Sequence, residues 1–198
     1  MKIEPHAIEE RDVDESARHY VGVMARAGVL DYSVAQEKKL DNRASCLIRE
    51  GLAYSSSLAD LRFCDAGPRN ICYQPGSSRP HPRVLARRAA AGKAIAAFAL
   101  TEPDAGSDVA AIQTSAQLDG DAYVINGRKR FISNAGIADF YTVFARTGTR
   151  EGGRSALSAF VVGAKVPGFT VVERTPLMAS HPIGEIAFEN CRVSGRGH

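Results

Sequence analysis

The sequence predicts an α+β fold, in which an N-terminal helical segment precedes an antiparallel β-barrel or sandwich domain. Three observations lead to this prediction. Apolar residues recur at three- and four-residue steps in the first sixty residues, prolines crowd the stretch 64–83, and short β-type runs separated by glycine turns fill the chain after Gly92. We therefore expect a helical domain at 1–92 with an irregular stretch at 64–83, a β domain at 93–193 and a tail at 194–198.

The first expected helix is amphipathic, and its apolar stripe consists of Ala17, Val21, Met24 and Ala25. Gly28 is a suitable stop, because glycine accepts the left-handed backbone conformation that ends many helices. A second helix is expected over 44–61. In 64–83, four prolines remove backbone donors, which predicts a loop. The same stretch is basic, but it has few of the interleaved aromatic residues that a nucleic-acid patch would carry.

Eight short segments after Gly92 have β character. They are residues 94–100, 114–117, 122–125, 129–133, 140–146, 157–162, 169–172 and 186–188. Turns are expected at Asp119-Gly120, Asn126-Gly127 and Pro167-Gly168, since Asp-Gly and Asn-Gly supply the positive φ angles of tight hairpins. Short strands at this spacing indicate an antiparallel sandwich or barrel.

The overall composition excludes several classes of protein. A formal net charge of +3 is too small to indicate a nucleic-acid or membrane partner, and the longest apolar run, 94–100, is far too short to span a bilayer. We expect a soluble, cytoplasmic protein. The cysteines, Cys46, Cys64, Cys72 and Cys191, form no C-x-x-C pair and no cluster with metal-ligand spacing, so we expect isolated reduced thiols and no metal.

The stretch 100–111, L-T-E-P-D-A-G-S-D-V-A-A, carries the main candidate for chemistry. Gly106 permits close approach of the backbone to a ligand, and hydroxyls and amides around it are suited to carbonyl or phosphate oxygens. The neighbouring carboxylates Glu102, Asp104 and Asp108 argue against a bare phosphate cradle. A turn with an Asx or Ser cap after a strand explains the same residues equally well.

Three segments resemble the acyl-CoA dehydrogenase family. Residues 99–111, A-L-T-E-P-D-A-G-S-D-V-A-A, match its signature, and 126–135, N-G-R-K-R-F-I-S-N-A, resemble its second element. Residues 188–193, F-E-N-C-R-V, resemble the strand that closes the family's middle domain. The resemblance covers 94–193, with weaker similarity back through 47–60, and it implies the family's β middle domain preceded by an incomplete helical domain.

The resemblance implies that FAD lies against two stretches of this chain. The implied cofactor-binding residues are Phe98, Ala99, Leu100, Thr101, Gly106 and Ser107 in the first stretch and Phe131, Ile132 and Ser133 in the second. Phe131 stands where the family has tryptophan, and Ser133 stands where it has threonine. Ser107 also matches a substrate-contacting position. The loop 147–155 resembles a region near the nucleotide part of CoA, so Arg154, with Arg150 and Ser155, is a candidate phosphate contact. Solvated loop charges are the alternative.

The family reaction removes a proton from the α-carbon of an acyl thioester and a hydride from the β-carbon, which passes to the flavin. The resemblance therefore implies FAD-dependent α,β-dehydrogenation of an acyl-CoA in fatty acid metabolism, with electron-transfer flavoprotein as acceptor and a homo-oligomeric assembly. The family base is a glutamate of a C-terminal helical domain that we do not find in this sequence. Glu102 and Asp104 belong to the binding motif, so we assign no base. The alternatives are a non-catalytic flavin- or CoA-binding remnant and one half of a split enzyme.

The pattern of the family fails at 64–83 and at 194–198, S-G-R-G-H, although the flanking residues match well. This abrupt loss leads to the hypothesis that both stretches reflect an altered reading frame. Residues 179–182, A-S-H-P, also differ from the family's Gly- and Arg-containing pattern. We therefore expect His181 to be structural and not catalytic.

Overall fold

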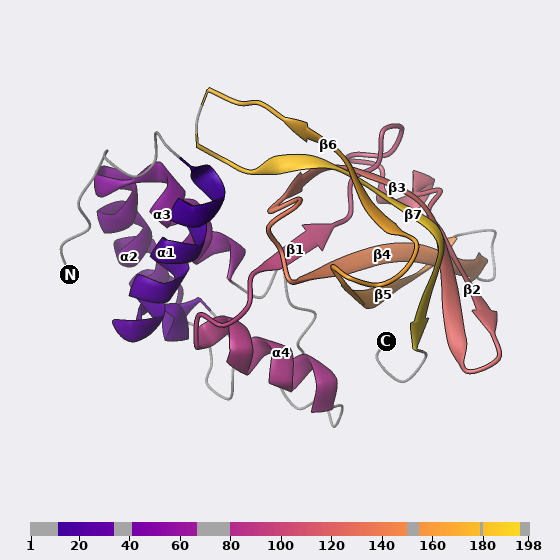
Figure 1. Cartoon of the computed structure of the whole chain (residues 1–198), viewed down its shortest axis with the longest axis horizontal. Helices are drawn as coiled ribbons and strands as arrows, with labels where there is room; N and C mark the ends of the chain where they lie inside the picture. Colours follow the sequence, from indigo (N-terminus) through magenta and orange to yellow (C-terminus); the bar gives the residue numbers. More distant parts are fainter. Residues whose placement is uncertain (1–11, 34–40, 67–79, 150–154, 179, 195–198) are drawn as a thin grey trace. The chain divides into compact units, whose positions relative to one another are not determined.

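The computed structural model describes residues 12–33, 41–66, 80–149, 155–178 and 180–194. It confirms the α+β class, because helices precede a group of strands along the chain (Figure 1). Internal contacts divide the chain into two units. One unit is Met1–Ala96 with Pro176–Pro182, and the other is Ala97–Thr175 with Ile183–His198. The expected domain limits at 1–92 and 93–193 stay a prediction.

The first helix, α1 (Val13–Arg26), confirms the predicted amphipathic pattern. The Asp12 carboxylate accepts hydrogen bonds from two backbone N–H groups of the first turn, at 2.8 and 3.1 Å, and these groups have no partner within the helix. Three residues of the predicted stripe are buried, namely Ala17, Val21 and Met24. Gly28 follows the helix with a φ of 69°, so the predicted stop is confirmed, and a short 3-10 turn, η1 (Val29–Tyr32), comes next.

The prediction of one helix over 44–61 is wrong, because two helices occupy this region, α2 (Asn42–Ser55) and α3 (Ser57–Asp65). Ser56 separates them with an extended backbone of φ −160° and ψ 121°. Its hydroxyl oxygen accepts the backbone N–H of Ala59 at 3.2 Å and so caps α3. The periodicity of apolar residues continues across this serine, which is why the sequence pattern did not reveal the break.

The irregular stretch expected at 64–83 is wrong at both ends, while 67–79 lie outside the described residues. Helix α3 continues to Asp65, and helix α4 spans Pro80–Ala90. The two prolines at the start of α4 are compatible with a helix, because the N–H groups of a first turn have no intrahelical partner to lose. The expected tail also lies outside the described residues from 195 onward.

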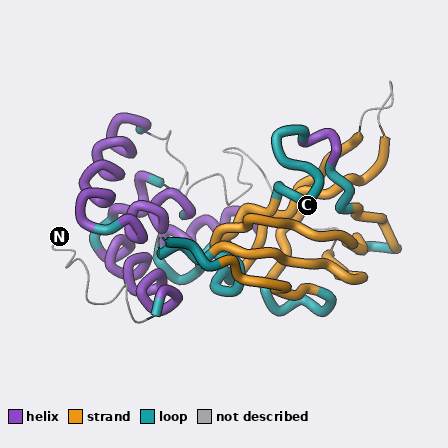
Figure 2. The backbone as a smooth tube through the Cα atoms, turned by 90° about the horizontal axis from the view of Figure 1, so that it is seen from above, coloured by secondary structure: helices purple, strands orange, loops and turns teal. Residues whose placement is uncertain are grey.

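The described strands form one sheet (Figure 2). They are β1 (Ala96–Ala99), β2 (Ser115–Asp119), β3 (Ala122–Ser133), β4 (Phe140–Thr149), β5 (Ser155–Gly163), β6 (Phe169–Thr175) and β7 (Ile183–Ser194). The order is β1-β4-β2-β3-β7-β6, and β5 pairs with β4. Four pairings are antiparallel as expected, β2–β3, β3–β7, β4–β5 and β6–β7, but β2 and β4 meet in a parallel bridge. The sheet is therefore mixed.

The turn predicted at Asn126-Gly127 is wrong, because both residues lie inside the continuous strand β3. The pairing of β3 with β7 shifts register between Ile125 and Gly127, so the strand bulges there. Gly127 has a φ of 146°, and a Cβ atom added to it would lie 2.5 Å from the Thr114 hydroxyl oxygen and 2.7 Å from the Thr114 Cα. Glycine is needed at 127 for this close approach and not for a hairpin.

Three of the four cysteines lie in the described part of the chain. None of the three, Cys46, Cys64 and Cys191, is in a disulfide bond, and burial raises the pKa of the Cys191 thiol to about 11. Cys72 lies outside the described residues. Within the described ranges, no helix combines the length and hydrophobicity needed to cross a membrane, and no three His, Cys, Asp or Glu residues group as metal ligands.

Candidate functional site

The first candidate stretch leaves strand β1 and folds at once into a tight turn. The Glu102 N–H donates to the Ala105 carbonyl at 2.9 Å, and the Ala105 N–H returns a longer bond of 3.4 Å. Ala105 is buried, whereas Pro103 and Asp104 at the tip are exposed. This turn fixes the backbone direction immediately after Thr101.

The segment that follows the turn is open to solvent. Gly106, Ser107 and Asp108 are exposed, and a Cβ atom added at Gly106 would meet nothing within 4 Å. The Asp108 carboxylate accepts the Ala110 N–H at 3.1 Å and caps the short helix η2 (Val109–Ala111), so the Asx-cap interpretation holds for this residue. The loop that carries η2 stands out from the strands in Figure 2. Space next to Gly106 and Ser107 is therefore available to a ligand.

Glu102 points into the protein and not toward this open segment. Its carboxylate accepts the N–H groups of Gln113 at 2.7 Å and Thr114 at 2.9 Å, and it accepts the Lys129 ammonium at 2.9 Å. Burial alone would raise the pKa of the Glu102 carboxyl, but the hydrogen bonds from Thr114, Lys129 and Gln113 outweigh it and hold the pKa below its usual range. The carboxylate is thus ionised and fully engaged.

Lys129 is the partner that the sequence analysis missed. Its side chain is fully buried, and Nζ donates to the Leu100 carbonyl and to Glu102 Oε1, both at 2.9 Å. Burial lowers the pKa of the Lys129 ammonium, and the Glu102 carboxylate opposes this shift. The sequence did hold a signal. Arg128 and Arg130 flank Lys129 in a strand, so the three side chains alternate between faces and one cation faces inward, where it requires a buried acid.

The second candidate stretch contains a bulge in β3. Lys129 pairs with Ile186 and Ile132 pairs with Gly184, so two residues of β3, Arg130 and Phe131, stand opposite the single residue Glu185 of β7. Phe131 has a positive φ of 57°, its side chain is 55% exposed, and the Arg130 guanidinium lies 5.0 Å from its ring centroid. Positive φ is costly for a bulky residue and is typical of sites under functional constraint.

The bulge joins the two candidate stretches. The Arg130 N–H donates to the Thr101 carbonyl at 2.9 Å, one residue along from the bond between Lys129 and the Leu100 carbonyl. Two consecutive residues of β3 therefore hold two consecutive residues of the first stretch. Segments almost thirty positions apart in the sequence lie side by side as a result.

The remaining predicted residues differ in what they present to a ligand. Ala99 and Ile132 are buried, so their side chains belong to the core and only their backbone is available. Leu100, Thr101 and Ser133 are half-buried at the junction, and Phe98 packs on Phe144 with ring centroids 5.1 Å apart. Arg150 and Arg154 lie outside the described residues.

His181 lies in the helical unit and is half-buried. Burial lowers the pKa of its imidazole, as does the Arg62 charge, while the Asp65 charge raises it. The expectation of a structural role for His181 stays a prediction.

Several known proteins are similar to this chain. Residues 97–191 match the family model described as acyl-CoA dehydrogenase, middle domain. The chain is 35% identical over 204 residues to the probable acyl-CoA dehydrogenase FadE25 of Mycobacterium tuberculosis, covering 98% of this chain and 51% of that protein. It is 33% identical over 202 residues to the 3-(aryl)acrylate reductase of Clostridium sporogenes, covering 98% and 52%. The chain thus spans about half the length of these curated relatives.

Solved structures give the same result for the fold and the family. The acyl-CoA dehydrogenase complexed with FAD from Bacillus anthracis superposes with a TM-score of 0.80 at 27% identity, covering 96% of this chain and 33% of that one. The acyl-CoA dehydrogenase from Geobacillus kaustophilus gives a TM-score of 0.75 at 25% identity, covering 94% and 51%. Together these matches show that the chain belongs to the acyl-CoA dehydrogenase family, with residues 97–191 as its middle domain.

Proposed function

We propose that this chain is the flavin-binding part of an acyl-CoA dehydrogenase and that it holds FAD along 98–107 and 131–133. The observation that carries the proposal is the junction of the two stretches, where the Arg130 N–H donates to the Thr101 carbonyl at 2.9 Å. The similarity to an acyl-CoA dehydrogenase complexed with FAD supports the cofactor. The junction creates one continuous surface from two motifs, as binding of a single large cofactor requires.

The groups at this surface fit an isoalloxazine ring. Phe131 offers an exposed aromatic face, which suits packing against a flat heterocycle. Backbone and hydroxyl groups near Thr101, Gly106 and Ser107 suit the polar edge of the ring, and the open space at Gly106 admits it. The one acidic group inside the junction, Glu102, is neutralised by Lys129 and so presents no bare charge to the flavin.

When bound, FAD would supply the hydride acceptor for α,β-oxidation of an acyl-CoA thioester. In our proposal the chain's own residues orient the ring, Ser107 contacts the substrate, and Arg154 binds a CoA phosphate. Glu102 is poorly suited to be the base, because its carboxylate already accepts three hydrogen bonds. Electron-transfer flavoprotein as acceptor, a homo-oligomer, a role in fatty acid metabolism and a cytoplasmic location belong to the same proposal.

Flavin absorbance of the purified full chain tests the proposal. Bound FAD that bleaches when an acyl-CoA is added would support dehydrogenation by this chain. Bound FAD without bleaching would favour the alternatives, a non-catalytic flavin-binding protein or one half of a split enzyme. If added FAD does not bind, the proposal fails.

A matched pair of variants locates the site. Phe131→Ala should weaken FAD binding about 2- to 12-fold, the range expected for one aromatic contact. Leu118→Ala is the control, because Leu118 is also a large apolar residue, 65% exposed, but it lies on β2 outside both stretches. Equal affinity of wild type and Phe131→Ala would remove Phe131 from the site.

A further inference from the structure

We propose that Glu102 and Lys129 form a positioning pair that fixes the open loop bearing Gly106 and Ser107 relative to the exposed Phe131 on β3. This inference rests on the proposed function, since these are the groups assigned to the flavin. The pair would not touch the cofactor or take part in proton transfer. Its role is to set the distance between the two halves of the site.

Glu102 closes the base of the loop. The chain leaves Glu102, passes through the exposed segment around Gly106 and Ser107, and returns at Gln113 and Thr114. The N–H groups of these two residues donate to the two oxygens of the Glu102 carboxylate, at 2.7 and 2.9 Å. One side chain therefore holds both ends of the loop, so the position of Glu102 determines the position of the whole loop.

Lys129 connects this closed base to strand β3. Its ammonium donates to the same carboxylate and to the Leu100 carbonyl, and it lies two residues before Phe131. The adjacent Arg130 N–H adds a third link, to the Thr101 carbonyl. The loop and the bulge are consequently parts of one hydrogen-bonded assembly, and Lys129 is its central member.

The hydrogen bonds of this pair require a carboxylate at position 102 and a cation at position 129. A glutamine at 102 would offer one acceptor oxygen, and its NH2 group would face a backbone N–H. A methionine at 129 fills similar space but would leave the Leu100 carbonyl without this donor and the buried carboxylate without its cation. Only a carboxylate with two acceptor oxygens and a cation with several donors satisfy every group at this position.

The test compares wild type with Lys129→Met, Glu102→Gln and the double variant, and Arg128→Met is the control. Arg128 precedes Lys129 on β3, but its side chain is 60% exposed and pairs with Glu185 at 3.3 Å. Amide hydrogen exchange measured by NMR on the chain without flavin reports the positions of the loop and bulge. FAD affinity and the flavin absorption spectrum report whether the site keeps its geometry. If the pair only stabilised the fold, these two readouts would not change in a folded variant.

In Lys129→Met, we expect exchange at the Gln113, Thr114 and Arg130 amides to accelerate at least 10-fold, FAD affinity to fall at least 10-fold, and the flavin spectrum to shift. Amides of helices α1 and α3, which belong to the other unit, should stay within 2-fold of wild type. The double variant should regain part of both losses, because it buries no unpaired charge, and Arg128→Met should match wild type. If Lys129→Met does not fold, the double variant and Glu102→Gln carry the same comparison.

Two results would overturn the positioning role. One is faster exchange at these amides with FAD affinity within 2-fold of wild type and an unchanged flavin spectrum. This result would mean that the pair stabilises the fold without positioning the site. The other is unchanged exchange at the three amides in a folded Lys129→Met. If the wild-type chain binds no FAD, the proposed function fails, and the amides alone decide whether the pair fixes the loop.

Discussion

Among the residues that the structure describes, each unit buries one cation almost completely, and the two cations differ in their hydrogen bonds. In the β unit, Lys129 donates to two acceptors at 2.9 Å, one a carboxylate that backbone amides also hold. In the helical unit, Arg62 is 1% exposed and its Nη2 lies 2.9 Å from Asp65 Oδ2. Among the described residues, however, the nitrogens of Arg62 have no hydrogen-bond partner of good geometry.

The difference shows what makes a buried charge useful. Removing an ion from water costs several kcal/mol, and an opposite charge compensates only when hydrogen bonds replace those to water. Burial lowers the pKa of both cations, and each carboxylate opposes the shift. Lys129 has the hydrogen bonds that compensate and holds two segments together, whereas Arg62 has a charge partner within its own helix, three residues away. We therefore expect Lys129 to stabilise its unit and Arg62 to contribute little.

The largest expected effect is that of Lys129→Met, which should destabilise the β unit by about 3–5 kcal/mol, because it leaves a buried carboxylate without its cation. Hydrogen exchange of the β3–β7 ladder amides as a function of denaturant measures this unit separately from the helices. The double variant Glu102→Gln with Lys129→Met is the control and should lose less. An equal loss in single and double variants would mean that lost packing, and not the unpaired charge, explains the effect.

The second effect is a loss of stability in acid that depends on Glu102. Its pKa is lowered in the folded chain, so the unfolded chain binds a proton first as pH falls below about 4.3. The contribution is complete above that pH and disappears as pH falls through the lower, folded-state pKa. The stability difference between wild type and Glu102→Gln should thus be constant from about pH 5 to 7. Below about pH 4 it should shrink by at most about 1.4 kcal/mol per pH unit. A pH-independent difference would contradict the assignment of Glu102 as the acid-sensitive group.

These two effects depend on the pair of Glu102 and Lys129, of which the sequence analysis singled out only Glu102. The resemblance implied that the stretches around Gly106 and Phe131 both contact the flavin, and the structure adds that Lys129 and Arg130 join them. The resemblance did not predict that Glu102 faces inward, since a carboxylate in a polar loop is more often solvated. Its orientation follows from the tight local turn that ends at Ala105 and from the amides of Gln113 and Thr114, which lie 11 and 12 positions further along the chain.

In the fold, too, some features were predicted from the sequence and others were not. Strand positions were predicted from local patterns, and most strands appear within a few residues of the expected segments. Breaks were harder to predict, because the same residue serves different purposes in different surroundings. Gly127 looked like a hairpin glycine but permits contact with Thr114, and Ser56 looked like part of a helix surface but caps α3. The contact of Gly127 with Thr114 depends on the tertiary fold, whereas the cap at Ser56 is local and was hidden by the apolar periodicity that continues across it.

The third prediction concerns Arg62, the buried cation of the helical unit. Arg62→Met should change the stability of the helical unit by less than about 1 kcal/mol in either direction, because it removes a costly buried charge along with one ion pair. The Asp65 side chain is 17% exposed although its Oδ2 is buried, so water replaces part of the lost interaction. Hydrogen exchange of the α1 and α3 amides is the measurement. A loss above about 3 kcal/mol would show that the Arg62–Asp65 pair stabilises the helical unit and would contradict the expected difference from Lys129.

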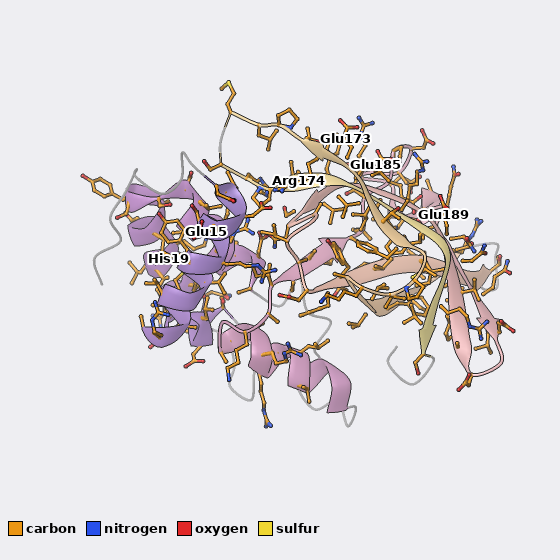
Figure 3. The ribbon with its side chains drawn as sticks, in the orientation of Figure 1. Glu15, His19, Glu173, Arg174, Glu185 and Glu189 are labelled. Carbon is orange, nitrogen blue, oxygen red and sulfur yellow. The ribbon has the colours of Figure 1, made fainter. Side chains whose placement is uncertain are left out.

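The smallest effect should come from Arg128, which differs from its neighbour Lys129 in side-chain direction. Arg128 pairs with Glu185 on β7, labelled in Figure 3, at 3.3 Å and with 60% of its side chain exposed. Water and salt screen such a pair, so Arg128→Met should cost at most about 0.5 kcal/mol, and less at high salt. Denaturant-dependent exchange at low and high salt measures it on the same ladder that reports Lys129→Met. If Arg128→Met and Lys129→Met lower the stability equally, the positive charge of β3 would matter more than whether the side chain is buried or exposed. A large difference between the two losses of stability would instead assign the effect to burial, since these adjacent cations of one strand differ mainly in how far their side chains are buried.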